Sequence, residues 1–321
     1  MRVLMVGKTS SIAIDTIRKY WGTVHYSKPT HLRPGKYDLI IAQEPTIRTG
    51  LPALLLAKLT MTPLFCEVHA DYLQHLNLAQ RATAYLVLKS SALVRAVNKK
   101  IEKQLRQIRI NKTITIPSIY IDPKIFYSLK KHHERRKLIL FIGRLTAQKG
   151  LDLLLAAYKH VTEQTNDTEL VIVGRGPLKN WLTQTINSMK LDRHVMVFDW
   201  VTQQELVRLY NDAAVLACTS RYEGGPRVVF EAAACETPSV STRVGIVPEA
   251  LQDGVEVILV DRNPAQIAEA AVKLLEDPQL RQRMGEAARR KTLALFSWEE
   301  AVKRYANAYI KALADINSVK T

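Results

Sequence analysis

A chain of 321 residues is long enough for two domains of ordinary size, and its 47% apolar and 24% charged residues are typical of a globular protein. No apolar run approaches the length of a membrane-spanning helix, and the chain opens on a predicted strand, Arg2–Val6, rather than on a signal peptide. The three cysteines are too widely spaced for a metal cluster or a disulfide framework, which predicts a reduced, cytoplasmic setting.

Positive charge is concentrated in the first part of the chain. Residues 1–137 hold 24 Lys and Arg against 8 Asp and Glu, whereas residues 138–321 hold 22 of each, so the whole formal charge of +16 lies in the first part. The segment 78–112 alone has nine cations and one acid, Glu102. This asymmetry predicts an anionic partner, such as a membrane surface, a lipid-diphosphate acceptor or nucleic acid. A solvated basic face, or an adaptation of the host proteome, is the alternative interpretation.

The chain up to residue 127 alternates short apolar runs with helical patterns, as βα units do. The predicted strands are Arg2–Val6, Tyr37–Ala42, Pro63–Val68, Ala92–Val97 and Thr113–Ile116. The predicted helices are Ser11–Tyr20, Thr49–Leu59, Tyr72–Lys89 and Lys99–Ile108. Residues 1–127 are therefore predicted to form one Rossmann-like domain, and the polar residues 128–137 a basic linker.

A second βα series follows in residues 138–296. Its predicted strands are Leu138–Ile142, Glu169–Val173, Val195–Phe198, Ala214–Cys218, Ser239–Thr242 and Glu256–Val260. Its predicted helices are Gly150–Glu163, Leu178–Met189, Gln203–Asn211, Arg227–Cys235, Pro264–Glu276 and Pro278–Leu293, and a last amphipathic helix covers Trp298–Leu313. The predicted fold class is α/β, with two Rossmann-like domains whose parallel sheets face each other across a cleft.

Two glutamates eight positions apart, Glu223 and Glu231, flank the start of a predicted Ala-rich helix. The first-turn N–H groups of a helix lack intrahelical partners and can bind phosphate. Because Pro226 has no N–H, these donors would be the amides of Arg227 and Val228. The loop before them contains Gly224 and Gly225. An anion site flanked by two carboxylates suits a ligand with a diphosphate between two polyols, such as a nucleotide sugar.

Four further segments carry candidate site residues at the carboxyl ends of predicted strands. Gly143, Arg144 and Lys149 follow the first strand of the second series, and two cations there can neutralise a leaving diphosphate. Gly174 and Gly176 follow the next strand and allow close backbone approach, although a purely structural turn explains them nearly as well. In the first domain, His69 ends a strand and Gly7 begins a short loop after another.

Residues 137–313 resemble the family 4 retaining glycosyltransferases of the GT-B fold, through the Glu-x7-Glu spacing and the segments around Arg144 and Gly174. The resemblance implies that Glu223 contacts the donor sugar, that Glu231 binds the ribose, and that Arg144 and Lys149 hold the diphosphate. It places Gly174 and Gly176 beside the base, His69 near the sugar, and the loop after Gly7 near the diphosphate and acceptor. It also implies that residues 297–321 cross back to the N-terminal domain.

The expected function is transfer of a sugar, with retention and without a metal ion, from a UDP- or GDP-sugar to a glycan or lipid-linked acceptor held by the N-terminal domain. No permanently bound cofactor is expected, and the protein would be cytoplasmic or peripheral on the inner face of a membrane. A nucleotide-sugar epimerase or hydrolase is the first alternative, with Glu44, Glu67 and Asp71 as its candidate acids. A nucleic-acid-binding protein is a weaker alternative, because no nucleic-acid motif is present. A catalytically silent partner of another transferase is also weaker, because the candidate site residues Arg144, Lys149, Glu223 and Glu231 are all present.

Overall fold

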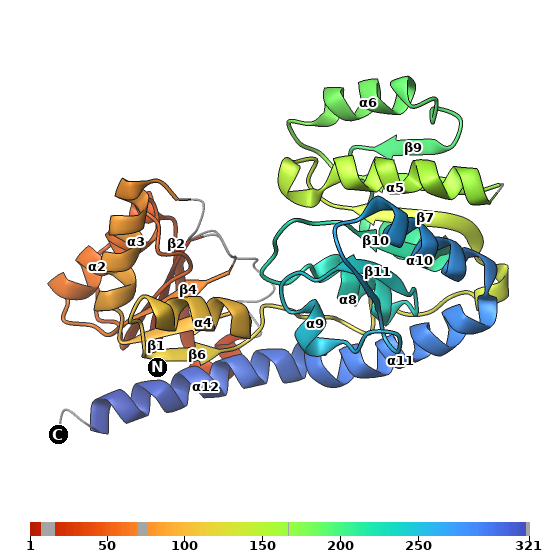
Figure 1. Cartoon of the computed structure of the whole chain (residues 1–321). Coiled ribbons are helices and arrows are strands. Elements are labelled where there is room, and N and C mark those ends of the chain that lie inside the picture. The colour runs from red at the N-terminus through yellow and green to blue at the C-terminus, as the bar shows by residue number, and fades with distance from the viewer. Residues whose placement is uncertain (8–16, 70–75, 166, 319–321) are drawn as a thin grey trace. The chain divides into compact units, whose positions relative to one another are not determined.

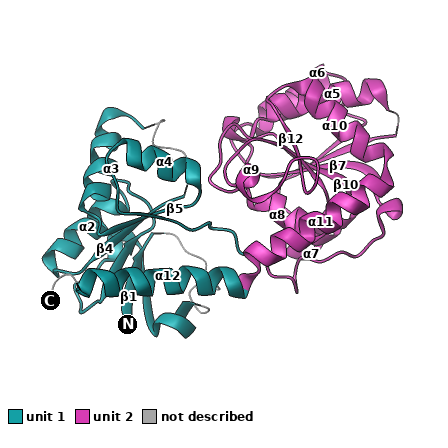
Figure 2. Cartoon of the chain, turned by 60° about the horizontal axis from the view of Figure 1, so that its bottom comes forward, with its two compact units in different colours: residues 1–120, 299–321 teal, residues 121–298 magenta. Residues whose placement is uncertain are grey.

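The computed structural model describes residues 1–7, 17–69, 76–165 and 167–318. The chain forms two compact units, shown in Figure 1 and Figure 2. Unit 1 consists of Met1–Tyr120 and Glu299–Thr321, and unit 2 consists of Ile121–Trp298. Each unit contains one six-stranded parallel sheet with helices packed against it, which confirms the predicted fold class.

The sheet of unit 1 has the strand order β2-β1-β3-β4-β5-β6. Its strands are β1 (Arg2–Val6), β2 (Thr23–Ser27), β3 (Leu39–Ala42), β4 (Leu64–Val68), β5 (Leu93–Ala96) and β6 (Thr113–Thr115). Its helices are α2 (Gly50–Leu59), α3 (Leu78–Ser90), α4 (Lys99–Gln107), α12 (Trp298–Ser318) and the short 3₁₀ turn η1 (Pro29–His31). The central strands β3 and β4 are buried along their whole length, as expected for continuous apolar runs in a parallel sheet.

Strand β2 is absent from the sequence prediction, and it lies at the edge of the sheet beside β1. Val24 is its single buried residue, so the apolar signal that marks the central strands is missing here. The helix predicted at Ser11–Tyr20 falls largely outside the described residues, which show helix at positions 17–21.

The sheet of unit 2 has the strand order β12-β11-β10-β7-β8-β9. Its strands are β7 (Arg136–Ile142), β8 (Glu169–Val173), β9 (Val195–Phe198), β10 (Ala213–Cys218), β11 (Ser239–Thr242) and β12 (Ile258–Val260). Its helices are α5 (Leu151–Gln164), α6 (Lys179–Ser188), α7 (Gln203–Asp212), α8 (Arg227–Ala234), α9 (Val247–Ala250), α10 (Pro264–Glu276) and α11 (Pro278–Phe296), with 3₁₀ turns η3 (His132–Glu134) and η4 (Ala147–Lys149). The order of the strands reverses between β7 and β10, and ligands of open parallel sheets bind at such a switch point.

Residues 128–137, predicted as a linker, lie within unit 2 and not between two domains. The Arg135 guanidinium is buried and donates to the Thr237 hydroxyl at 2.7 Å and to the Cys235 carbonyl oxygen at 2.8 Å. His132 is also buried, next to α11. The linker prediction is therefore wrong. A run of charged residues suggests a solvated segment, but Arg135 and His132 of this run form hydrogen bonds with residues about 100 or more positions away in the sequence.

The last helix, α12, packs on unit 1 and continues five residues past the predicted end at Leu313. Its buried side chains recur every three or four residues, which gives the helix one apolar face. Trp21 donates through its ring N–H to the Ala306 carbonyl oxygen at 3.1 Å, and its ring packs against those of Tyr305 and Tyr309. The end of the chain thus completes the core of the N-terminal unit.

Candidate active site

The loops that follow β7 and β10 meet at the switch point of unit 2. The Arg221 N–H donates to the Gln148 carbonyl oxygen at 2.7 Å, and the Thr219 hydroxyl donates to the carbonyl oxygens of Lys149 and Gly150. Gly150 has φ +67°, and a Cβ there would lie 2.1 Å from the Thr219 carbonyl oxygen. Only glycine therefore fits this position, and it holds the two loops together.

Lys149 and Glu223, which lie 74 positions apart in sequence, form an ion pair across these loops. The Lys149 ammonium lies 2.5 Å from Glu223 Oε1, and the Ser220 hydroxyl donates to the same oxygen at 2.8 Å. Both charged side chains are largely buried, so the pair is well fixed. Ser220 was not predicted as a site residue, since a serine before a glycine-rich loop carries no signal in the sequence. The cluster offers a cation for phosphate and a carboxylate for hydroxyl groups.

Glu231 projects from α8 and is 7% exposed. Its Oε2 accepts a hydrogen bond from the Tyr210 hydroxyl at 2.8 Å, and its Oε1 pairs with Arg227 Nε at 2.7 Å. Burial, together with the negative charge of Glu231, raises the pKa of Tyr210 well above its usual value, so the phenol stays a donor. Each carboxylate oxygen can accept a second bond, and the Arg227 side chain is exposed enough to move aside. Glu231 can thus receive the hydroxyls of a ligand.

Helix α8 begins at Arg227, as predicted, with Pro226 at the N-cap position. Within the described part of the chain, the backbone N–H groups of Arg227 and Val228 have no acceptor. The preceding loop is held by Gly245, whose φ is +56° and whose Cβ, if present, would lie 2.7 Å from the Gly224 carbonyl oxygen. The loop containing Gly224 and Gly225 therefore ends at two amide donors that can bind an anion.

The glycines after β7 and β8 serve the packing of the two loops against each other. The Gly143 N–H donates to the Val173 carbonyl oxygen at 3.0 Å, and the Leu145 N–H to that of Arg175 at 2.8 Å. A Cβ on Gly174 would lie 1.8 Å from the Gly143 carbonyl oxygen, and one on Gly176 would lie 2.3 Å from that of Leu145. Backbone packing therefore accounts for both glycines, and their contact with a nucleotide base stays a prediction.

Arg144 lies in the same loop as Gly143 and is exposed. Among the described residues its guanidinium has no hydrogen-bond or ion-pair partner. A cation held on a fixed loop without a protein partner is available to a ligand. The structure thus brings Gly143, Arg144 and Lys149 into one loop, and Lys149 and Glu223 into contact.

His69 and Gly7 belong to unit 1 and are described apart from the residues above. His69 Nε2 lies 3.0 Å from Glu67 Oε2, and its Nδ1 lies 3.2 Å from the Ser118 hydroxyl, so both ring nitrogens are engaged while the ring stays partly exposed. Gly7 has φ +144° and packs on Gln43, whose buried Oε1 has no hydrogen-bond partner among the residues that the structure describes. The rest of the loop after Gly7 lies outside the described residues.

A buried carboxylate orients His69. Glu67 is 2% exposed and accepts hydrogen bonds from Arg95 at 3.0 Å, Tyr305 at 2.7 Å and Tyr309 at 2.8 Å. Burial alone would raise the pKa of Glu67, but the charge of Arg95 and the bonds from His69 and Tyr305 outweigh it and hold this pKa well below its usual range. The sequence did not indicate this cluster, because its members come from β4, β5 and α12.

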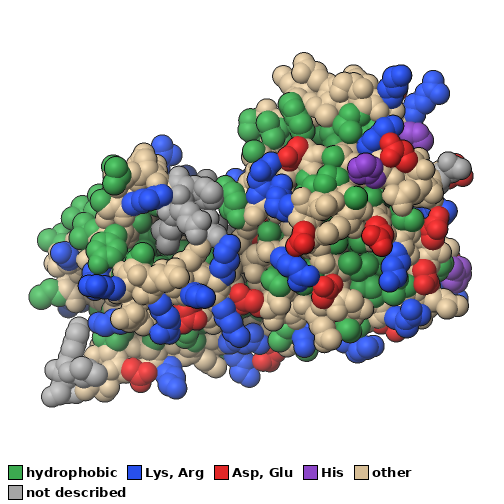
Figure 3. Space-filling view, in the orientation of Figure 1, with side chains coloured by type: hydrophobic (Ala, Val, Ile, Leu, Met, Phe, Trp, Pro, Cys, Tyr) green, Lys and Arg blue, Asp and Glu red, His purple; other side chains and the backbone are tan. Residues whose placement is uncertain are grey.

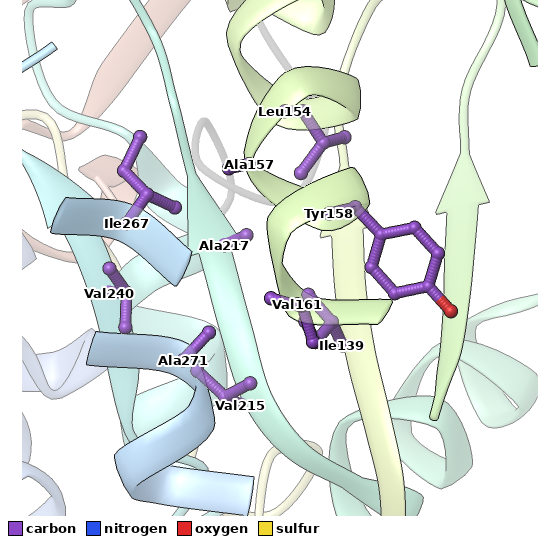
Figure 4. Close-up of a pocket in the computed structure, with 10 residues that line it drawn as sticks. All are labelled: Ile139, Leu154, Ala157, Tyr158, Val161, Val215, Ala217, Val240, Ile267 and Ala271. Atoms are coloured by element: carbon purple, nitrogen blue, oxygen red, sulfur yellow. The ribbon is translucent and has the colours of Figure 1, made fainter. Parts of the chain in front are cut away.

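A gap of about 10 Å³ lies in unit 2, between α5, α10 and the sheet. Figure 4 shows the ten residues that line it. Aliphatic side chains line it, and the Tyr158 hydroxyl at its edge already donates to the Thr168 carbonyl oxygen at 2.8 Å. The gap has room for at most about one water-sized sphere and its lining is apolar, so it is a packing defect and not a ligand site. In the described ranges no three His, Cys, Asp or Glu side chains gather as metal ligands, and no helix there has the length and hydropathy to span a bilayer.

Comparison with known proteins places these features in a family context. Residues 127–291, just over half of the chain, match the family described as glycosyl transferases group 1. Spore coat protein SA of Bacillus subtilis is 30% identical over 186 residues, which cover 55% of this chain and 49% of that protein. N-acetyl-alpha-D-glucosaminyl L-malate synthase of Bacillus anthracis is 28% identical over 239 residues, covering 71% of this chain and 62% of that protein. The chain spans about half the length of the curated relatives it matches.

Among solved structures, Anabaena HepE in complex with UDP and glucose superposes with a TM-score of 0.82, covering 96% of this chain and 99% of that chain. Its sequence identity is 17%, so this likeness supports the fold, which is GT-B.

Proposed function

Because the chain belongs to the glycosyl transferases of group 1, we propose that it transfers a sugar from a nucleotide-diphosphate donor to a glycan or lipid-linked acceptor. The observation that carries the proposal is the meeting of Lys149, Glu223 and the start of α8 at the switch point of unit 2. HepE was solved with UDP, and also with UDP-glucose, which favours a nucleotide-sugar donor here as well.

The donor would lie along the loops after β7 and β10. Its diphosphate would contact the Arg144 and Lys149 side chains and the amides of Arg227 and Val228. Glu231 would bind the ribose hydroxyls. The hydrogen bond that the Glu231 carboxylate accepts from Tyr210 would hold it in position for this contact. These groups supply positive charge where the leaving diphosphate becomes more negative. We propose that this charge stabilises the leaving group without a metal ion.

Glu223 would accept hydrogen bonds from the sugar hydroxyls once the donor phosphates draw Lys149 away from it. His69, oriented by Glu67, would contact the sugar from unit 1. The bond between the anomeric carbon and the diphosphate oxygen breaks with its electron pair on that oxygen. The acceptor hydroxyl attacks from the same face, its proton passes to the leaving phosphate, and the anomeric configuration is retained. We also propose that the chain is a member of glycosyltransferase family 4 and that the protein is cytoplasmic.

The epimerase or hydrolase alternative is disfavoured by the environment of Glu67. An acid or base catalyst must exchange protons with a ligand, but Glu67 is buried and already accepts bonds from Arg95 and two tyrosines. Of the other candidates, Glu44 is exposed and Asp71 lies outside the described residues.

Thermal stabilisation by UDP-, GDP- and ADP-sugars, and by the parent diphosphates, tests the donor site. We expect one base to raise the melting temperature of the wild type, since a ligand at a hundred times its Kd adds about 2.7 kcal/mol to the free energy of unfolding. Glu231→Gln should lose most of that rise. Glu169→Gln, which removes an exposed carboxylate paired with Arg136, should keep it. No stabilisation by any donor, or an equal loss in both variants, would overturn the proposal.

A further inference from the structure

Most of the basic segment 78–112 does not itself present the apolar face that membrane binding requires. Its helix α4 is strongly amphipathic, but the apolar residues Ile101 and Leu105 point into the core of unit 1. Leu88, Val94 and Val97 are buried in the same core. The exposed large apolar side chains of this segment are Leu78, Tyr85, Leu86 and Ile108, and the first three lie on α3. A membrane contact must therefore use α3 together with residues outside the segment.

An exposed apolar face occurs on helices α2 and α3 of unit 1. Leu59 is 73% exposed, Met61 just after α2 is 89% exposed, and Leu78 at the start of α3 is 86% exposed. Leu55 and Leu86 are exposed on the same two helices. We call these five residues the α2–α3 face. The two helices pack beside each other, and Figure 3 shows hydrophobic side chains gathered over them.

The helical spacing explains why these side chains point outward. In α2, residues 53, 54, 56 and 57 are buried, so the turn containing Leu55 and Leu59 faces away from the sheet. In α3, residues 84, 87 and 88 are buried, which leaves Leu78 and Leu86 on the outer side. Burying such side chains from water is worth about 1.5–3 kcal/mol each, so a face of this kind is a candidate for an interaction.

The charge around the face selects the partner. Helices α2 and α3 contain no Asp or Glu, and the chain has no acid from residue 45 to 66 or from 72 to 101. Lys58 of α2 and Lys89 of α3 are exposed among the apolar residues. A second copy of the chain would bring these cations opposite like charges, which disfavours self-association. An anionic surface with an apolar interior is complementary to both features.

We infer that the α2–α3 face docks unit 1 onto a bilayer that contains anionic phospholipid. The five apolar side chains enter the boundary between headgroups and acyl chains, while Lys58 and Lys89 pair with lipid phosphate or carboxylate groups. The biological role of this docking rests on the proposed function, because docking would bring a lipid-linked acceptor within reach of the enzyme. The binding itself requires no catalysis, so it is measured separately.

Vesicle flotation tests the inference with purified wild type, using phosphatidylcholine vesicles and vesicles that also contain phosphatidylglycerol. We expect binding to the anionic vesicles and little to the neutral ones. Leu55→Ser with Leu59→Ser should reduce the binding at least tenfold. Lys58→Ala and Lys89→Ala should each reduce it about fivefold, the equivalent of one cation near an anionic membrane. Trp200→Ser, which removes an exposed aromatic residue of unit 2, is the matched control and should bind like the wild type.

Two further measurements keep the outcomes distinct. The donor-induced melting shift should be the same in every flotation variant, because none of the substituted residues lies in the candidate active site. A shift that is absent while vesicle binding persists would refute the proposed function and leave the docking face standing. Equal flotation of all variants would overturn the inference. So would light scattering that shows a wild-type dimer dissociated by Leu55→Ser with Leu59→Ser.

Discussion

The buried carboxylate of Glu67 permits a prediction with a defined magnitude. Glu67→Gln replaces a charged acceptor by a neutral amide, and leaves the buried Arg95 guanidinium without its counterion. Removing one partner of a buried ion pair costs about 3–5 kcal/mol, because the remaining charge is no longer compensated. Arg95 and both tyrosines donate to Oε1, so an amide oxygen at that position can still accept from them, whereas the amide nitrogen would face His69 Nε2 in place of Oε2. We expect the free energy of unfolding to fall by about 3–5 kcal/mol.

The assay is urea unfolding followed by circular dichroism and by tryptophan fluorescence, since Trp21 packs against Tyr305 and Tyr309 in the affected unit. Glu102→Gln is the matched control in the same unit. Its pair with Arg106 is solvent-exposed on the arginine side, so we expect a loss of about 1 kcal/mol or less. If Glu67→Gln costs no more than Glu102→Gln, then Arg95 does not depend on a charged partner, and the account of this cluster is wrong.

Three more predictions concern pH, backbone and site. The pKa of Glu67 is depressed in the folded state, so the carboxylate stabilises the fold at pH values above its unfolded pKa of about 4.3. This stabilisation is lost as the pH falls below about 4.3. The difference in unfolding free energy between wild type and Glu67→Gln should therefore narrow in acid titrations below that pH. Gly150→Ala should lower the free energy of unfolding by well over 1 kcal/mol and weaken donor binding. Its control is Gly254→Ala, where φ is also positive but nothing lies within 4 Å of the added methyl, and the expected loss is about 1 kcal/mol. Equal losses for the two variants on chemical denaturation would contradict this. Arg144→Ala should lower kcat about a hundredfold without changing the melting temperature. Arg208→Ala, which removes an exposed arginine outside the candidate active site, should leave the steady-state kinetics unchanged. Full activity of Arg144→Ala would show that Arg144 does not have the proposed role.

Central strands such as β3, β4 and β8 could be predicted from local sequence, because each is a short apolar run that is almost entirely buried. The bounds of β8 agree with the prediction to the residue, as do those of β11 and of the edge strand β9. The edge strand β2 could not be predicted, since one buried valine gives no pattern. The linker prediction failed for a related reason: the buried state of Arg135 depends on carbonyl and hydroxyl groups a hundred residues away.

The candidate site divides in the same way. Local spacing placed Glu223, Glu231, Arg144 and Lys149 at strand ends and a helix start, because alternation of strands and helices sends those ends to one edge of a parallel sheet. Local spacing could not assign the Ser220 hydroxyl to Glu223, because that contact depends on how the loop folds.

Tertiary structure alone joined Tyr210 to Glu231, and two tyrosines of the last helix to Glu67. It also turned Leu55 and Leu59 outward while burying their neighbours. Sequence patterns determine which residues can be buried and where the chain turns, since those are properties of a few adjacent residues. The partner of a buried charge, and the side of a helix left to solvent, depend on which elements pack together, and that is a property of the whole fold.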